Sequence, residues 1–189
     1  MIIVMAGLPG TGKSAIAARL RRELPAAVID KDRIRDALFA PDHIAYSTEQ
    51  DDFCQSIMLE ATAYLLNADR RQHVILDGRT FSRQYQIASL DAFAVEHDTS
   101  LQIIECVCSD AVARRRLAQD VASGTHLADN RDFALYLAIK ARYEAIREPK
   151  LVINTDNELR ICVAQVLAYL NVESNSVDIP MHSNVIRRG

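Results

Sequence analysis

A glycine-rich segment near the start of the chain has the spacing of a phosphate-binding loop. The segment GLPGTGKS, residues 7–14, fits the pattern G-x-x-x-x-G-K-S/T and lies between a short apolar run and a segment with helical periodicity. Glycines let the backbone approach an anion closely, and the backbone amides and the helix N-terminus point at it. We call these residues the phosphate loop and predict that all eight bind a nucleotide: Gly7, Leu8, Pro9, Gly10, Thr11, Gly12, Lys13 and Ser14.

The last two side chains of the phosphate loop have separate expected roles. Lys13 is expected to reach the β- and γ-phosphates of ATP, and Ser14 to offer its hydroxyl to a magnesium ion that bridges the same phosphates. Asp77 closes the apolar run VIL, where its carboxylate can hold a magnesium-bound water. Capping of the following turn, GRTFS, is the structural alternative for Asp77.

Two aspartates follow the second apolar run of the chain, AAVI. In open α/β sheets, ligands bind at the carboxyl ends of the strands, and this is where Asp30 and Asp32 are predicted to lie. A carboxylate there can accept the proton of an attacking hydroxyl, a role that we assign to Asp32. Arg35, one helical turn on, can orient a polar or anionic acceptor. Capping of the next helix is the alternative for both aspartates.

An arginine run, residues 114–116, lies in a predicted helix. Phosphoryl transfer benefits from a cation that closes over the developing charge. Neighbouring helical positions point about 100° apart, so only one or two of these arginines can face a nucleotide. Residues 120–130 have the small and polar composition of a mobile surface loop. We therefore predict a lid over residues 115–132, with one or two arginines of the run and Arg131 as its candidate nucleotide-binding residues.

Short apolar runs alternate with helical segments along the chain, which predicts an α/β fold with a parallel sheet covered on both faces. The strands are expected at IIVMA, AAVID, HVILD, LQIIECV and KLVINT. A long helix is predicted over residues 48–67, capped by Ser47 and with these side chains facing inward: Phe53, Ile57, Ala61, Tyr64 and Leu65.

Two further helices are predicted in the second half of the chain. One is expected over residues 131–147. Thr155 and Glu158 have the spacing of a capping box, which predicts the start of the last helix, and its inward-facing residues are predicted to be Leu159, Val163, Val166 and Leu170.

The composition excludes several classes of protein. The chain has 189 residues, of which 49% are hydrophobic, and a formal net charge of -3. That length fits one domain, and that charge provides no global positive field for nucleic acid or an anionic membrane. The four cysteines lack C-x-x-C spacing, so we interpret them, including Cys106 and Cys108, as reduced thiols. No signal peptide or long apolar span is found, which predicts a cytoplasmic protein without membrane contact.

The motifs GLPGTGKS, DKDRIR, VILDGRTFS and CSDAVARRRL occur in this order. With them the chain resembles the P-loop kinase superfamily over about residues 1–170, in particular the ATP-dependent kinases related to the kinase domain of polynucleotide kinase. It is also similar to adenylylsulfate kinase, gluconate kinase, chloramphenicol phosphotransferase and zeta toxins. These proteins share one core and phosphorylate very different acceptors, so the resemblance implies the chemistry better than the substrate.

The resemblance also implies roles for single residues. The general-base aspartate of polynucleotide kinase falls on Asp32, its substrate-phosphate arginine on Arg35, and the acidic residue after the third strand on Asp77. In related lids a second arginine follows the first by four residues. Aligning the first with Arg116 leaves Asp120 at the second position, so Arg131 or another arginine has to replace it.

Together these observations predict a three-layer P-loop fold whose five parallel strands have the order 2-3-1-4-5, an order that the resemblance implies. Residues 1–171 form the kinase domain and residues 172–189 a tail. The predicted reaction moves the γ-phosphate of ATP, with Mg²⁺, to a hydroxyl of a small-molecule or nucleotide-like acceptor. A polynucleotide 5′-hydroxyl kinase and a non-catalytic ATP-binding regulatory switch are the alternatives. Neither the acceptor nor the oligomeric state follows from the sequence.

Overall fold

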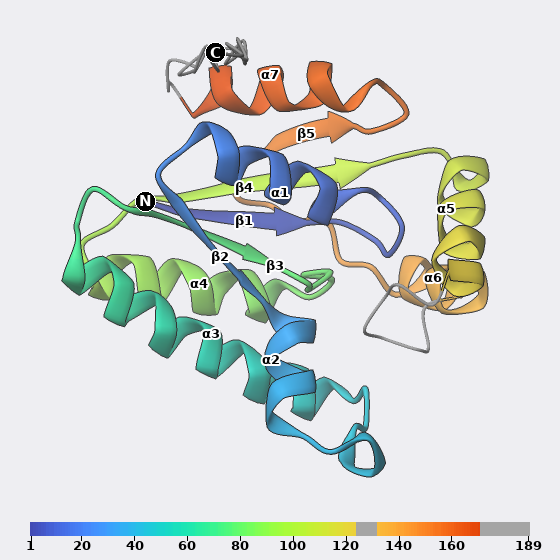
Figure 1. The fold of residues 1–189 in the computed structure, drawn as a ribbon, viewed down its shortest axis with the longest axis horizontal. Coiled ribbons are helices and arrows are strands. Elements are labelled where there is room, and N and C mark those ends of the chain that lie inside the picture. The colour runs from blue at the N-terminus through green and yellow to red at the C-terminus, as the bar shows by residue number, and fades with distance from the viewer. Residues whose placement is uncertain (124–131, 171–189) are drawn as a thin grey trace, which may run out of the picture.

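The computed structural model describes residues 1–123 and 132–170. Within them, five parallel strands form one sheet in the order β2-β3-β1-β4-β5, which confirms the predicted α/β class and strand order (Figure 1). The strands are β1 (Ile2–Ala6), β2 (Ala26–Asp30), β3 (His73–Asp77), β4 (Leu101–Val107) and β5 (Leu151–Asn154).

Helices cover both faces of this sheet (Figure 1). In chain order the helices are α1 (Lys13–Glu23), α2 (Lys31–Leu38), the 3-10 turn η1 (Pro41–His43), α3 (Thr48–Ala68), α4 (Gln84–Glu96), α5 (Asp110–Ser123), α6 (Phe133–Ala141) and α7 (Leu159–Tyr169). Helices α1 and α7 pack on one face, and α3 and α4 on the other. Helices α5 and α6 stand beyond the carboxyl ends of the strands, toward which the arrowheads point.

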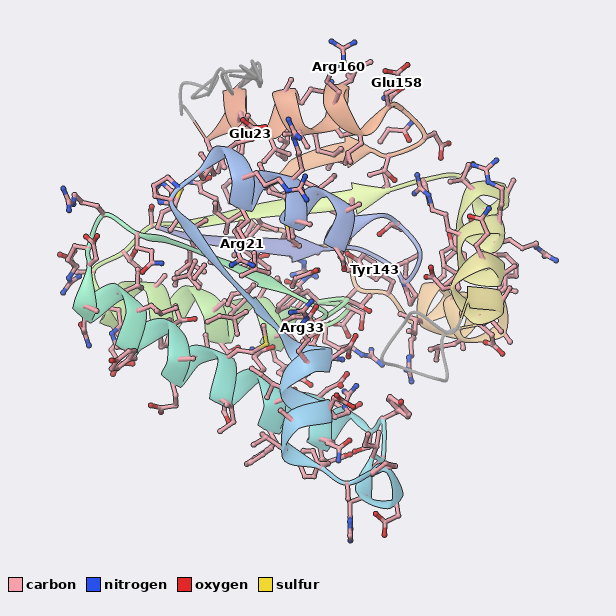
Figure 2. All side chains as sticks on the ribbon, in the orientation of Figure 1. Arg21, Glu23, Arg33, Tyr143, Glu158 and Arg160 are labelled. Carbon is pink, nitrogen blue, oxygen red and sulfur yellow. The ribbon has the colours of Figure 1, made fainter. Side chains whose placement is uncertain are left out.

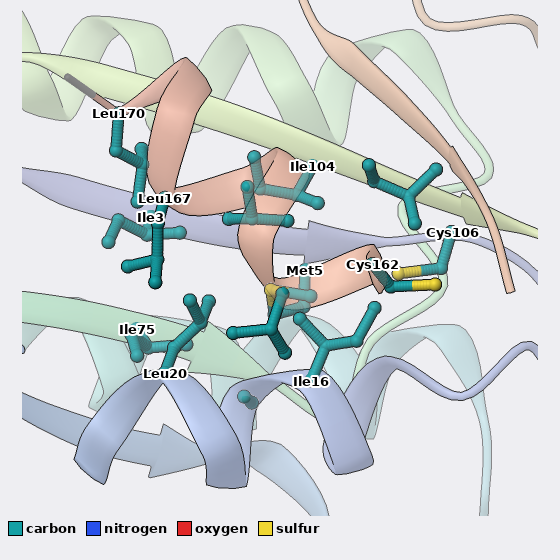
Figure 3. Close-up of a cluster of buried hydrophobic side chains, with 14 of the residues drawn as sticks. Ile3, Met5, Ile16, Leu20, Ile75, Ile104, Cys106, Cys162, Leu167 and Leu170 are labelled. Atoms are coloured by element: carbon teal, nitrogen blue, oxygen red, sulfur yellow. The ribbon is translucent and has the colours of Figure 1, made fainter. Parts of the chain in front are cut away.

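The central strand β1 is completely buried and divides the core in two. Successive side chains of a strand point to opposite faces, so Ile3 and Met5 pack with α1 and α7, whereas Ile2 and Val4 pack with α3 and α4. Figure 3 shows the first of these clusters, with the side chains of Ile3 and Met5 between the two helices. An apolar run of this kind is what a parallel strand covered on both faces requires.

Helix α3 has the predicted cap, since the Ser47 hydroxyl oxygen accepts a hydrogen bond from the Gln50 amide. The predicted inward face of this helix is confirmed at Leu65, which packs against the core, and is wrong at Phe53 and Tyr64. Phe53 and Tyr64 are exposed, and the buried residues are Cys54, Gln55, Met58, Thr62 and Leu66.

The predicted capping box at the start of α7 is also wrong. Glu158 is exposed, points away from the sheet in Figure 2 and makes no capping hydrogen bond. Of the predicted inward face, Leu159 is 44% exposed, whereas the other three residues, Val163, Val166 and Leu170, are buried as predicted. The Thr155 hydroxyl is instead buried against the phosphate loop, where it donates to the Thr11 carbonyl. The chain therefore contacts the phosphate loop directly after strand β5.

The predicted lid and tail fall partly outside the described residues. Helix α5 continues to Ser123, so residues 120–123 are helical and not loop as predicted. Helix α6 begins at Phe133 and ends at Ala141, six residues earlier than predicted. Arg131 and the tail, residues 172–189, lie outside the part that the structure describes. Among the described residues, no helix combines the length and apolar character needed to cross a bilayer.

Candidate active site

The phosphate loop connects β1 to α1 at the carboxyl edge of the sheet. Gly7 has φ 125°, and a Cβ atom there would lie 2.2 Å from the Cys106 carbonyl oxygen, so only glycine lets β1 leave the sheet beside β4. Gly12 has φ 83° and stands as the N-cap of α1 without a side-chain cap. The first amides of α1 are therefore left facing the loop, as an anion-binding helix terminus requires.

Lys13 and Ser14 are the first residues of α1. Lys13 is 6% exposed, and its Nζ donates to the carbonyl oxygens of Gly7 and Leu8 at 2.7 and 2.9 Å. These bonds hold the ammonium group across the mouth of the loop. The side chain of Ser14, the next residue, is exposed. Lys13 and Ser14 line one cavity, so a phosphate bound there would lie close to both the ammonium and the hydroxyl.

The residues predicted to hold magnesium suit that ion. Asp77 is 1% exposed, and its Oδ1 is buried without a hydrogen-bond partner, a costly arrangement for a carboxylate. Asp77 and Ser14 line the same hollow beside α1. Among residues 1–123 and 132–170 no three His, Cys, Asp or Glu side chains gather for a metal. Mg²⁺ needs no such cage, because it binds through one or two protein oxygens together with phosphates and water.

The two aspartates after β2 lie close together but are held differently. Asp30 is the N-cap of α2, since its Oδ1 accepts from the amides of Asp32 and Arg33 at 2.8 and 3.2 Å. Burial, and then the charge of Asp77, raises the pKa of Asp30. Asp32 lies in the first turn of α2, and its Oδ1 accepts from Arg35 Nη1 at 3.0 Å. The capping alternative thus describes Asp30, whereas Asp32 uses its side chain for an ion pair.

Two cavities meet at these residues. The larger cavity, of about 460 Å³, runs along the phosphate loop and is lined among others by Gly12, Arg116 and Thr155. The smaller cavity, of about 140 Å³, lies toward α2 and α6. Three side chains line both cavities: Lys13, Ser14 and Asp32. A group bound in one cavity would therefore be next to a group bound in the other, with the Asp32 carboxylate at their junction.

Arg116 is the arginine of the run that faces the phosphate loop. Its Nη1 donates to Thr155 Oγ1 at 3.0 Å, and its Nη2 to the Thr155 carbonyl at 2.7 Å. Arg114 and Arg115 are exposed, and the Arg114 guanidinium covers the Phe133 ring. One arginine of three thus faces the loop, as helix geometry requires. Arg116 lines the larger cavity, and its closing over a γ-phosphate stays a prediction.

The structure adds cavity residues that sequence reasoning missed. Thr155 positions Arg116, and Lys31 pairs with the carboxylates of Asp32 and Asp51. Arg79 is 2% exposed and lines the smaller cavity with Arg142. A glycine-arginine pair directly after a predicted strand was the available signal for Arg79. The helix predicted over residues 131–147 contains Arg142, whereas α6 ends at Ala141. No local sequence pattern therefore identified Arg142 as a cavity residue.

A family model described as an AAA domain matches residues 2–146 of the chain. The chain belongs to this family. No curated protein matches it by sequence. The AAA domain therefore accounts for the segment from β1 through the turn after α6, which contains the phosphate loop, both aspartates after β2 and the arginine run.

Several solved structures share the fold of this AAA domain. A gluconokinase from Sinorhizobium meliloti has 18% identity and a TM-score of 0.66, with 89% of this chain and 90% of that chain covered. A sugar kinase from Janibacter sp. has 16% identity and a TM-score of 0.62, with coverage of 90% and 94%. The APS kinase of Mycobacterium tuberculosis, solved with AMPPNP and APS, has 18% identity and a TM-score of 0.60, with coverage of 90% and 96%. At these identities the likeness establishes a P-loop kinase fold.

Proposed function

We propose that the chain is an ATP-dependent phosphotransferase that moves the γ-phosphate of ATP to a hydroxyl of a small acceptor. The observation that carries the proposal is the meeting of the two cavities at Lys13, Ser14 and Asp32. A kinase has to hold the γ-phosphate and the acceptor hydroxyl in contact and in line, and a shared wall between two cavities is suited to this. The kinase fold of the solved relatives supports the same reaction class.

In this reaction the acceptor oxygen forms a bond to the γ-phosphorus as the bond from that phosphorus to the β,γ-bridging oxygen breaks. The bonding electron pair leaves with ADP. The hydroxyl proton passes to the Asp32 carboxylate, whose Oδ1 is oriented by Arg35, and later to solvent. Lys13 offsets charge on the phosphates. Ser14 and Asp77 would hold magnesium, which supplies further charge neutralisation when bound.

The test is ADP release in the presence of ATP and magnesium across a panel of acceptors. The panel holds nucleosides, 5′-hydroxyl oligonucleotides, adenylylsulfate, sugars, sugar acids and aminoglycoside or phenicol antibiotics. Lys13→Ala is the blank. Release stimulated by one acceptor class is expected. Nucleotide binding without stimulated release by any of them would contradict the proposal and favour a regulatory switch.

Asp32→Asn distinguishes a kinase from an ATPase that binds a second ligand without phosphorylating it. Asparagine keeps an oxygen for Arg35 but cannot take up the proton, so stimulated release should fall at least about 100-fold while ATP binding is unchanged. Asp36→Asn, an exposed position on the same helix, is the matched control and should retain activity. If the Asp32 variant retains the stimulated rate, the assignment of Asp32 as the base is wrong.

A further inference from the structure

The smaller cavity has a lining with a large excess of positive charge. Its cationic side chains come from five residues, Lys13, Lys31, Arg35, Arg79 and Arg142, and its carboxylates from two, Asp32 and Asp51. Like charges gathered in a hollow that excludes part of the water repel one another more strongly than on an open surface. An anionic occupant would remove this repulsion.

Two of these arginines are more deeply buried than the carboxylates that they contact. The side chains of Arg35 and Arg79 are each 3% exposed, whereas their partners Asp51 and Asp52 are 28% and 43% exposed. Both arginines also have a buried Nε without a hydrogen-bond partner. Buried donors in proteins are nearly always satisfied, so these guanidinium groups are incompletely paired by the protein itself. A ligand with several acceptor oxygens can accept further hydrogen bonds from these guanidinium groups. The more exposed carboxylates of Asp51 and Asp52 can move into solvent when such a ligand replaces them.

The opposite wall of the smaller cavity carries another arginine. Arg142 directly follows α6, and its side chain has no ion pair within the described parts of the chain. Leu135 and Ile139 of α6 line the same wall. Tyr46 closes a further side, with the Arg35 guanidinium 5.0 Å from the centre of its ring. Residues of α2 and residues in and directly after α6 thus line the same small cavity, and these cations are gathered around one space.

We propose that the smaller cavity binds the phosphate acceptor and that this acceptor is a small molecule with an anionic group, a carboxylate, phosphate or sulfate, besides its hydroxyl. The inference rests on the proposed function for the transfer itself, and it adds the class of substrate. Arg35, Arg79 and Arg142 bind the anionic group by charge-assisted hydrogen bonds. The hydroxyl then lies at the junction with the larger cavity, beside Asp32.

The first experiment measures anion binding without turnover. The chain is saturated with magnesium and a non-hydrolysable ATP analogue, which occupies the phosphate loop, and inorganic phosphate is titrated in by calorimetry. Saturable binding at millimolar concentration is expected. It should weaken about tenfold or more in Arg142→Ala and in Arg79→Lys, because a charge-assisted hydrogen bond is lost or misaligned. The matched control is Arg71→Ala, whose side chain is 92% exposed in the turn before β3.

The binding experiment overturns the inference if phosphate does not bind, or if it binds equally well to wild type and both cavity variants. Since Arg142 is exposed, its substitution should leave the fold intact even if Arg79→Lys does not fold.

The second experiment compares acceptors in pairs that differ by one anionic group: a sugar acid and its parent sugar, and a nucleoside 3′-phosphate and its nucleoside. The charged member should have the lower KM, and Arg142→Ala should raise that KM and leave the KM of the neutral member unchanged.

Neutral members that react as well as charged ones would overturn the inference and leave the kinase proposal standing. A 5′-hydroxyl oligonucleotide preferred over every small acceptor would overturn its small-molecule part. Saturable phosphate binding without stimulated ADP release would refute the kinase proposal and keep the anion site.

Discussion

Replacing Thr155 with valine removes one hydroxyl group from the contact between β5, α5 and the phosphate loop. That hydroxyl donates to the Thr11 carbonyl at 2.8 Å and accepts from Arg116 Nη1 at 3.0 Å. Valine has nearly the same shape, so the substitution leaves packing unchanged and deletes both bonds. Among the described residues, Arg116 then keeps its bond to the Thr155 carbonyl and a longer one, 3.4 Å, to the Gly10 carbonyl.

The expected loss of stability follows from these contacts. Thr155 is 5% exposed, so water cannot replace the missing hydroxyl freely. A hydrogen bond to a charged group contributes about 1.5–3 kcal/mol to the free energy of unfolding. For a domain of this size, each kcal/mol changes the melting temperature by roughly 2–4 °C. Thr155→Val should therefore lower the melting temperature by about 3–12 °C.

Thermal unfolding followed by circular dichroism, with and without ATP and magnesium, tests this prediction. Thr155→Ser retains the hydroxyl and should lose less than half as much stability. If Arg116 binds the nucleotide, the valine variant should also gain less stability from ATP than wild type, because its guanidinium is less firmly held. A valine variant with the wild-type melting temperature would refute the role of this hydroxyl.

Two further predictions concern the phosphate loop and the amino end of the sheet. Gly7→Ala should abolish ATP binding in calorimetry, because its Cβ would lie 2.2 Å from the Cys106 carbonyl oxygen at a φ of 125°; wild-type affinity would contradict the loop geometry. Burial, and then the positive charge of the N-terminus, lowers the pKa of His73. Its protonation therefore favours the unfolded chain, and stability should fall as pH drops below about 6.5, the ordinary histidine pKa. His73→Gln should reduce this pH dependence of the melting temperature, and an unchanged slope would contradict the assignment.

The strands could be predicted because each is marked by a short, continuous run of apolar residues in the sequence. A short apolar run such as Ile2–Ala6 is buried on both faces, so the run itself identifies the strand. Helix α3 gives no such signal. Its buried face includes Gln55 and Thr62, whose polar groups are satisfied by Ser89 Oγ at 3.0 Å and the Met58 carbonyl at 2.7 Å. Hydrophobicity alone placed Phe53 and Tyr64 inside, because a sequence does not reveal which polar side chains find partners.

The phosphate loop and the smaller cavity also differ in how far they could be predicted from the sequence. The loop binds through backbone of eight consecutive residues, so its spacing is visible in one line of sequence. The arginines of the smaller cavity are separated by 44 positions from Arg35 to Arg79 and by 63 from Arg79 to Arg142, and they follow or belong to three different elements. Arg35 and Arg79 line one cavity because they follow neighbouring parallel strands, β2 and β3, whose carboxyl ends lie at one edge of the sheet, and Arg142 joins them from the end of α6.

This difference also bears on what can vary within the fold. Changing the phosphate loop alters backbone that must approach an anion closely, so the donor side of the reaction tolerates little substitution. Arg79 and Arg142 are single side chains on a turn and at a helix end, outside the strands of the sheet. Acceptor choice can therefore change through a few separate positions without a new scaffold. For this chain, the charges at those positions favour an anionic acceptor, and pairs of acceptors that differ by one charge test that preference directly.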